Sequence, residues 1–379
     1  MAGGFNVLVS YGNFFTAKNS WPIRSNVVKV ELSKIKRVLI IRPGAIGDVL
    51  LTTPFIRALK KALPEAVIDY VAAPFPAKIL EGNPYLSNVI VFDKSKKTNF
   101  IVKNINDLNF YLSLAKNKYD LVFDLFGNLR SALMAFLSGA RYRAGFTFRV
   151  RKYLYNIKVK PAQDPMYNVH YHTQLLTAIG IPEDGEELDF IIPEAEKAKA
   201  TRLINTVKTG GPVIGLNPSG TWPTKRWPEE KFGELAGLIL SGIKGSSVIV
   251  LWGPGEQHMA EKVLKNCPVK QGIIIAPQTS LKELAALIGQ MDVLVTNDGA
   301  PKHISVAMKT PAVTIFGPTN SISWNPHNNP YYPAVVSALA CAPCDKTQCP
   351  DKDIECMKKI SAADVFETVK NTAALKSRV

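Results

Sequence analysis

Short apolar runs alternate with amphipathic stretches along the chain from Arg37 onward. In the first half, the runs that predict strands cover residues 38–41, 67–73, 89–92 and 121–126. The stretches between them predict helices over residues 48–63, 107–117 and 128–138. Continuous apolar strands separated by helices are typical of a parallel sheet that helices cover on both faces.

The same alternation starts again at Pro212. Here the predicted strands cover residues 213–218, 247–253, 273–276, 293–298 and 312–317. The predicted helices cover residues 228–242, 256–266, 280–289 and 301–308. The sequence therefore predicts an α/β protein made of two domains of similar design.

We divide the chain at the points where these patterns change. Residues 1–36 begin without a clear period and are expected to form an N-terminal extension. The two domains are expected over residues 37–190 and 191–360, joined by the Pro- and acid-rich stretch 181–196. Residues 361–379 contain a terminal helix, and the sequence leaves open whether it crosses back to the first domain.

The composition agrees with a folded protein of this size. The chain has 379 residues, of which 46% are apolar and 20% charged, which fits two domains and excludes a mostly disordered chain. No apolar run reaches the roughly 20 residues that span a bilayer. Residues 5–15 have no basic stretch before them and no cleavage site of the Ala-x-Ala kind after them. We therefore expect a cytoplasmic protein without a secretory signal.

Positive charge is concentrated in one part of the sequence. The whole chain has 46 Lys and Arg against 31 Asp and Glu, a formal net charge of +15. Residues 94–160 alone hold 14 Lys and Arg against 3 Asp and Glu. Such a block attracts an anion, which could be nucleic acid, an anionic membrane surface or an acidic substrate. The alternative is a solvated basic face.

Four of the five cysteines lie close together near the C-terminus, at Cys341, Cys344, Cys349 and Cys356. A cytosolic chain does not depend on disulfides. Only the first interval, C-x2-C, matches common zinc knuckles. Reduced thiols that pack a C-terminal loop are the favoured interpretation, and a four-thiolate metal site is the alternative.

The loops that follow the predicted strands carry the candidate chemistry, because ligands of open α/β sheets bind beyond the carboxyl ends of the strands. The first such loop runs from Arg42 to Asp48 and contains Gly44 and Gly47, which let the backbone turn tightly and approach a ligand. Asp48 is either an ordinary N-cap or a carboxylate that takes a proton from a substrate hydroxyl. The loop lacks the G-x-G-x-x-G pattern of dinucleotide-binding proteins.

Two later loops offer groups that suit a sugar nucleotide. The loop after residues 213–217 contains Ser219, Thr221 and Lys225, so that hydroxyls and an ammonium could bind a diphosphate. Glu256, after the next strand, could accept hydrogen bonds from ribose hydroxyls. Each also has a plain structural interpretation, as a polar loop and as a carboxylate at a helix start.

A further loop precedes the helix predicted over residues 301–308. Asp298 and Gly299 stand just before this helix, whose first amides would point at an anion. Pro301 suits the first helical turn. His303 lies in the same turn, where it could contact a ligand, although an isolated histidine is more often structural.

Taken in order, these segments resemble glycosyltransferase family 9, the lipopolysaccharide heptosyltransferases. The matching pieces are RVLIIRPGAIGDVLLTTPFIRALKKALP (37–64), NPSGTWPTKRWPEEKF (217–232), WGPGE (252–256) and TNDGAPKHISVAMKTPAVTIFGPT (296–319). The cysteine pattern of residues 341–357 is similar to the branch of the family that adds the second heptose. The resemblance extends from about residue 37 to residue 371.

The resemblance implies a GT-B fold, in which two Rossmann-like domains with parallel sheets face a central cleft. The first domain would bind the acceptor and the second the ADP-sugar donor. It implies inverting transfer of a heptose from ADP-heptose to the inner core of lipopolysaccharide. Because no Asp-x-Asp metal clamp stands out in the sequence, we expect this transfer to need no metal and no cofactor. The partners would be the nucleotide sugar, the anionic acceptor and the cytoplasmic face of the inner membrane, to which the protein would bind peripherally, and not nucleic acid.

By the same resemblance, Asp48 is the expected general base. The expected donor-binding residues are Ser219, Thr221, Lys225, Glu256, Asp298, Gly299 and His303. From the residues themselves, the expected acceptor-binding positions are Gly44, Gly47, Arg130 and Arg143. The two arginines belong to the basic block, and each could equally be a surface charge. No residue is expected to bind a metal.

Two positions depart from the family pattern. Asn297 and Lys302 stand where other residues are expected, so the resemblance does not fix the donor sugar. One alternative function is another sugar-nucleotide enzyme of the same fold, with a different donor or with 2-epimerase activity. The other is a polyanion-binding protein, although the chain lacks the interleaved aromatic and basic residues of single-strand binders.

Overall fold

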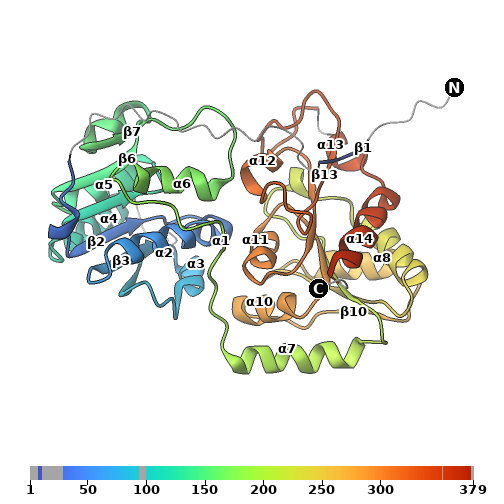
Figure 1. Cartoon of the computed structure of the whole chain (residues 1–379). Coiled ribbons are helices and arrows are strands. Elements are labelled where there is room, and N and C mark those ends of the chain that lie inside the picture. The colour runs from blue at the N-terminus through green and yellow to red at the C-terminus, as the bar shows by residue number, and fades with distance from the viewer. Residues whose placement is uncertain (1–6, 11–28, 94–99, 352, 377–379) are drawn as a thin grey trace. The chain divides into compact units, whose positions relative to one another are not determined.

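The computed structural model describes residues 7–10, 29–93, 100–351 and 353–376. These residues form two α/β units, shown in Figure 1. We call Thr16–Ile191 the N-terminal unit, and Ile192–Val379 together with Met1–Phe15 the C-terminal unit. No helix of the described residues is both long and apolar enough to cross a bilayer.

The N-terminal unit is built on a parallel sheet with the strand order β4-β3-β2-β5-β6-β7. Its strands are β2 (Arg37–Ile41), β3 (Val67–Ala72), β4 (Asn88–Val91), β5 (Leu121–Asp124), β6 (Tyr142–Phe146) and β7 (Ile157–Val159). The central strand β2 is apolar from Val38 to Ile41 because both of its faces are fully buried.

Helices connect these strands. They are α1 (Ile46–Leu50), α2 (Thr53–Ala62), α3 (Pro74–Leu80), α4 (Phe100–Ala115), α5 (Leu129–Leu137) and α6 (Asn168–Thr177), with the short 3₁₀ helices η1 (Leu32–Lys34) and η2 (Arg149–Leu154). The prediction of a single helix over residues 48–63 is wrong, since the structure divides this stretch into α1 and α2. Pro54, in the first turn of α2, has no amide hydrogen with which to continue the ladder from α1.

The C-terminal unit contains a second sheet, with the order β1-β13-β12-β11-β8-β9-β10. Its strands are β1 (Val7–Ser10), β8 (Val213–Asn217), β9 (Ser247–Val250), β10 (Ile273–Ile275), β11 (Val293–Asn297), β12 (Ala312–Phe316) and β13 (Ala334–Ser337). All of its pairs are parallel except that of β1 with β13. Part of the expected N-terminal extension is therefore a strand of this sheet.

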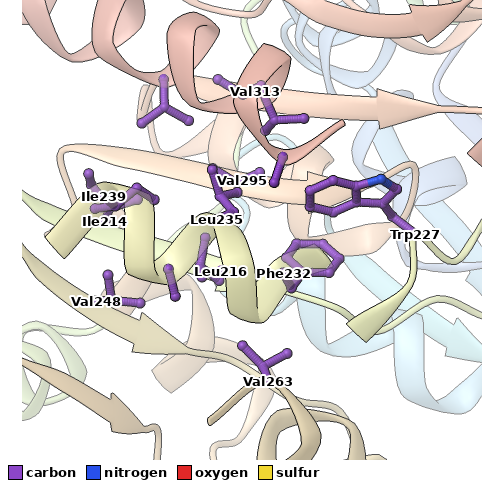
Figure 2. Packing of buried hydrophobic residues seen from close by; sticks show 14 of the residues in the cluster. Ile214, Leu216, Trp227, Phe232, Leu235, Ile239, Val248, Val263, Val295 and Val313 are labelled. Atoms are coloured by element: carbon purple, nitrogen blue, oxygen red, sulfur yellow. The ribbon is translucent and has the colours of Figure 1, made fainter. Parts of the chain in front are cut away.

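The helices of this unit are α7 (Glu194–Val207), α8 (Glu229–Gly242), α9 (Gln257–Asn266), α10 (Leu281–Gly289), α11 (Ala300–Ala307), α12 (Ser321–Trp324), α13 (Glu355–Lys358) and α14 (Ala362–Lys376), with the 3₁₀ helix η3 (Pro223–Lys225). Five of them, α8, α9, α10, α11 and α14, follow the predicted positions closely, whereas α7, α12, α13 and η3 were not predicted. Figure 2 shows how Leu235 and Ile239 of α8 pack over the sheet residues Ile214 and Val295, with Trp227 at one end of the cluster.

The terminal helix α14 packs within the C-terminal unit. It contacts α8 and the strands β11 and β12. Its residues Val365 and Val369 are fully buried in the same core as Trp227. Although the sequence left open a crossing of this helix to the first domain, these contacts include it in the C-terminal unit.

The acid-rich stretch between the domains is attached to the N-terminal unit rather than free. Arg57 of α2 is only 7% exposed. Its Nε donates to Asp184 Oδ2 at 2.7 Å, and its Nη1 donates to Asp189 Oδ2 at 2.6 Å. The stretch 181–196 predicted as a linker is thus held on α2 over much of its length, and its last residues already belong to α7, which begins at Glu194.

Candidate functional site

The loop between β2 and α1 holds the carboxylate of Asp48 close to the backbone. Helix α1 begins at Ile46, so that Ala45 is the N-cap and Asp48 is the third helical residue, not the N-cap that the sequence suggested as one reading. Asp48 Oδ2 accepts a hydrogen bond from the Ala45 amide at 2.9 Å, and Oδ1 accepts one from Arg42 at 3.0 Å. The side chain is 20% exposed, so the carboxylate can still accept a proton from outside.

Two residues of the loop keep Asp48 in this position. A Cβ added at Gly44 would lie 2.7 Å from Asp48 Oδ2, closer than non-bonded atoms approach, so only glycine leaves room for the carboxylate. The Arg42 guanidinium is itself fixed, because its Nη1 donates to the Leu125 carbonyl at 2.7 Å and the group lies over the Phe126 ring. Gly47 is buried within α1.

Helix α6 brings a histidine near this loop that the sequence analysis did not single out. His172 is 2% exposed, and its Nδ1 has no hydrogen-bond partner among the described residues. Burial, and then the charge of Arg42, lower the pKa of His172 well below its usual value, so the imidazole is neutral. Nothing local in the sequence marks His172, because only the fold brings α6 to the end of β2.

In the C-terminal unit, residues that follow three different strands meet at Asp298. Lys225, after β8, donates to Asp298 Oδ2 at 2.8 Å. Thr319, after β12, donates to the same oxygen at 2.8 Å. The Asp298 side chain is 3% exposed and that of Lys225 is 15% exposed. The carboxylate therefore orients the ammonium of Lys225 rather than standing free to bind a ligand.

A second lysine lies behind the same carboxylate. Lys302 is completely buried, and its Nζ is 4.0 Å from Asp298 Oδ1 and 3.4 Å from His303 Nδ1. It also donates to the Trp324 carbonyl. Desolvation lowers the pKa of Lys302 to about 7, and burial followed by the two nearby lysines lowers the pKa of His303 well below its usual value. His303 is thus a neutral, 3% exposed side chain beside two amines.

The loop that carries Ser219 is pinned to β11 by Asn297. The Asn297 Nδ2 donates to the Pro218 carbonyl at 2.8 Å, and its Oδ1 accepts from the Trp227 amide at 3.0 Å. Asn297, one of the two departures from the family pattern, is therefore a loop anchor. The buried Ser219 Oγ makes no hydrogen bond among the described residues, which leaves a hydroxyl available for a ligand.

The other predicted donor-binding residues lie around this group. Glu256 precedes α9 and approaches Arg226 at 3.7 Å, and the Nε of Arg226 donates to the Gly220 carbonyl at 2.6 Å. Thr221 is exposed. Gly299 is the N-cap of α11. The structure thus gathers Lys225, Asp298 and His303 directly, and links Glu256 to their loop through Arg226.

The two predicted acceptor arginines differ in their surroundings. Arg130, at the start of α5, has a 46% exposed side chain and lies 3.9 Å from Asp107. Arg143 donates to the Leu154 carbonyl at 3.0 Å and to the Ala140 carbonyl at 2.7 Å, and burial lowers its pKa. Arg143 is therefore engaged in holding β6 and η2 together, whereas Arg130 is free to turn toward a ligand.

The four C-terminal cysteines lie in a segment that folds back on the end of β12. The amide of Cys344 donates to the Pro318 carbonyl at 2.9 Å, and the Ser337 hydroxyl donates to the Cys356 carbonyl at 2.9 Å. Burial, and then the other three thiols, raise the pKa of Cys356 to about 11. Among the described residues, no group of three or more His, Cys, Asp or Glu is arranged to hold a metal ion.

Comparisons with known proteins agree with this architecture. The sequence model of a family described as glycosyltransferase family 9 (heptosyltransferase) matches residues 108–355. Lipopolysaccharide heptosyltransferase 3 of Escherichia coli is 27% identical over 288 residues, which are 75% of this chain and 84% of that protein.

Two solved structures share the fold. Escherichia coli ADP-heptose lps heptosyltransferase II matches with a TM-score of 0.71 at 20% identity, covering 90% of this chain and 99% of that one. An Escherichia coli heptosyltransferase with ADP-2-deoxy-2-fluoro heptose matches with a TM-score of 0.64 at 22% identity, covering 88% and 99%. With the two parallel sheets described above, these likenesses confirm the expected GT-B class of α/β fold.

Proposed function

Because this chain belongs to glycosyltransferase family 9, the heptosyltransferases, we propose that it transfers a heptose from ADP-heptose to the inner core of lipopolysaccharide, with inversion at the anomeric carbon. The names of the similar Escherichia coli proteins, which mention lipopolysaccharide and ADP-heptose, support this donor and this acceptor. Asp48 acts as the general base.

The group around Asp298 suits the diphosphate of the donor. Lys225 carries a positive charge that Asp298 and Thr319 hold in place, and the first amides of α11 add a partial positive charge. Ser219 and Thr221 offer hydroxyls, and Glu256 accepts hydrogen bonds from the ribose. Gly299 and His303 complete the donor side, where the lack of a side chain at Gly299 lets a phosphate approach the first amides of α11.

The chemical step needs one base and one cationic pocket. The acceptor hydroxyl oxygen bonds to the anomeric carbon while its proton passes to Asp48. The bond from that carbon to the β-phosphate oxygen breaks, and ADP leaves with the electron pair. Lys225 and the start of α11 stabilise the charge that develops on the diphosphate, so the transfer is proposed to need no divalent metal and no cofactor. Full activity in the presence of a chelator is the expected result.

The observation that carries the proposal is the state of the Asp48 carboxylate. Both of its oxygens are held by hydrogen bonds, from Ala45 and from Arg42, yet a fifth of the side chain remains exposed. A base fixed in this way needs no reorganisation before it takes a proton. General-base catalysis typically contributes about 10²- to 10⁴-fold to a rate.

The deciding experiment replaces Asp48 by asparagine. The Asp48→Asn variant should lose roughly 10²- to 10⁴-fold in the rate of transfer, measured as ADP release and by mass spectrometry of the acceptor. Its affinity for ADP, measured by calorimetry, should stay within about twofold, because Asp48 is not a donor-binding residue. A variant that transfers at the wild-type rate would remove Asp48 from the mechanism.

The acceptor side is proposed to use the N-terminal unit. The loop that contains Gly44 and Gly47 lies beside the acceptor next to Asp48. The exposed Arg130 binds carboxylates or phosphates of the acceptor, and Arg143, whose guanidinium holds two backbone carbonyls, adds positive charge nearby. A protein acting on such a glycolipid would bind the cytoplasmic face of the inner membrane peripherally.

Screening nucleotide sugars by calorimetry separates ADP-heptose from the donors of related enzymes. A 2-epimerase would convert its substrate without any acceptor.

A further inference from the structure

Exposed apolar side chains gather on one part of the N-terminal unit. Helices α4 and α5 and the 3₁₀ helix η2 are neighbours, since α4 contacts α5 and α5 contacts η2. Of the twelve large apolar residues that are well exposed in the described part of the chain, eight lie on these three elements. We call their exposed faces the α4–α5–η2 surface.

Helix α4 carries an exposed apolar stripe beside its buried one. Tyr111 and Leu114 are buried against the core of the unit. Ile105, Leu108 and Leu112 repeat at intervals of three and four residues on the exposed stripe, where their exposed fractions are 52%, 47% and 48%. A surface helix normally turns its apolar stripe toward the core, so an apolar stripe that no described element covers is available for a contact outside the unit.

The other two elements extend the apolar area. Leu129 and Phe136 lie seven residues, about two helical turns, apart on α5 and are 55% and 48% exposed. Val150 and Tyr153 of η2 are 70% and 71% exposed, which are the highest fractions among the well-exposed large apolar residues described. Exposure of such side chains to water is unfavourable in free energy, so a contiguous group of them marks a contact surface.

Cations outnumber acidic residues around this apolar area, where Asp107 of α4 lies 3.9 Å from Arg130. Residues 129–160 contain eight Lys and Arg and no Asp or Glu. Lys152 and Lys158 lie 5.3 and 5.9 Å from the centre of the Tyr153 ring, and Arg143 lies 5.6 Å from that of Phe136. Apolar and aromatic side chains flanked by lysine and arginine are typical of segments that insert at the headgroup level of anionic membranes.

We propose that the α4–α5–η2 surface docks on the surface of an anionic phospholipid bilayer. The inference rests on the proposed function, because a membrane-bound acceptor gives the enzyme a reason to dock. The apolar side chains enter the region between headgroups and acyl chains, and the lysines pair with lipid phosphates. Charge complementarity selects the bilayer as partner, since an apolar protein surface would gain nothing from the excess of positive charge on residues 129–160.

The test is binding of the full-length protein to vesicles of phosphatidylcholine with or without phosphatidylglycerol, measured by flotation. Wild-type protein should bind the anionic vesicles, and less tightly as salt is added. Val150→Ser with Tyr153→Ser should reduce the partition coefficient at least roughly tenfold. Ile105→Gln with Leu112→Gln, in a different element, should do the same while keeping a good helix former at each position.

Two further variants separate charge from hydrophobicity and from damage to the fold. Lys152→Gln with Lys158→Gln should weaken binding to anionic vesicles roughly fivefold for each charge removed, and should flatten the salt dependence. Phe75→Ser is the matched control, because Phe75 is 46% exposed but lies on α3, outside the surface. It should bind vesicles as the wild type does.

Activity on two acceptors makes the failure of this proposal distinguishable from that of the proposed function. With a deacylated, soluble core oligosaccharide, the Val150→Ser and Tyr153→Ser variant should transfer heptose at the wild-type rate. If neither the wild type nor the variant transfers heptose but vesicle binding depends on these residues, the docking proposal is supported and the proposed function fails.

If the wild-type protein does not bind anionic vesicles, or if the variants bind them as well as the wild type, the docking proposal is overturned. Loss of a protein dimer in the same variants would overturn it as well, by assigning the surface to a second copy of the chain.

Discussion

The guanidinium of Arg42, the first residue after β2, donates a 3.0 Å hydrogen bond to Asp48 in the first turn of α1. Arg42 is anchored in turn by the Leu125 carbonyl at the end of β5. The neighbouring strand therefore determines where the carboxylate points, through a side chain that need not touch a substrate.

Arg42 is accordingly expected to be a positioning residue. Arg42→Gln should lower kcat roughly 10- to 100-fold, because a displaced base loses alignment with the acceptor hydroxyl. Arg42→Lys should recover part of the loss, since the ammonium can still pair with Asp48. Steady-state kinetics on both variants checks this, and KM for ADP-heptose should change little. A fall in kcat that is matched by a collapsed melting temperature in both variants would instead indicate a purely structural role.

A single methyl group at Gly44 is expected to disable the same carboxylate. The added Cβ of Gly44→Ala would lie 2.7 Å from Asp48 Oδ2, so the side chain must turn away and transfer should fall by about 10²-fold. Gly289→Ala is the matched control, because its Cβ would meet Met308 at an ordinary 3.7 Å on the surface of α10. The control should keep full activity and gain slightly in stability. Wild-type activity in Gly44→Ala would contradict the steric argument.

The buried Lys302 predicts a distinctive dependence of stability on pH. Its pKa in the folded protein is lowered to about 7, whereas the unfolded chain keeps the usual value of 10.5. Between these values the unfolded state binds a proton that the folded state lacks, so this lysine makes wild-type stability rise with pH across that window. Lys302→Met should therefore be more stable than wild type near pH 6, by roughly 5 °C, and the difference should shrink toward pH 10.

Thermal unfolding at several pH values checks this. Lys244→Met, a change at an exposed lysine, is the control and should leave the pH dependence unchanged. A constant difference between Lys302→Met and wild type across the range would show that burial of the ammonium is compensated in the folded protein.

His170 predicts the opposite sign. Its ring nitrogens lie 2.7 Å from Glu183 and from Glu186, and these hydrogen bonds raise the pKa of His170 to about 10. The stabilisation is complete below the unfolded value of 6.5 and is lost as the pH rises through 10. His170→Gln should cost about 1 kcal/mol or less at pH 6, because the side chain is half-exposed, and nothing above pH 10. Denaturant unfolding at the two pH values tests this, with the exposed His258→Gln as control.

The sequence predicted the centre of each sheet well but its borders poorly. Strands such as β2 and β11 are buried on both faces, so their residues form continuous apolar runs that periodicity detects. Strand β6 carries Arg143 and Gly145, and β7 has an exposed lysine at its middle position, so neither shows such a run. Strand β1 forms only because β13, from the far end of the chain, supplies a partner.

The candidate site could likewise be predicted only in part. The loops after strands could be located because parallel strands end at one edge of their sheet, which is why Lys225 and Asp298 are neighbours. What these residues do to each other could not be foreseen. Asp298 is predicted from the sequence to bind the donor, and only the structure reveals that it accepts a hydrogen bond from Lys225 and lies 4.0 Å from the buried Lys302. Such pairings depend on side-chain burial across distant segments, and a local pattern does not encode them.

The attachment of Arg57 to Asp184 and Asp189 sets a limit on where the chain could be cut. In the folded protein the Arg57 guanidinium is nine-tenths enclosed, and a fragment that ended before Asp184 would lack both of its counter-ions. Stranding a charge in this way typically costs about 3–5 kcal/mol, a large share of the stability of one domain. The acidic stretch therefore belongs to the folded N-terminal unit. A truncation before this stretch would yield an insoluble or unfolded product.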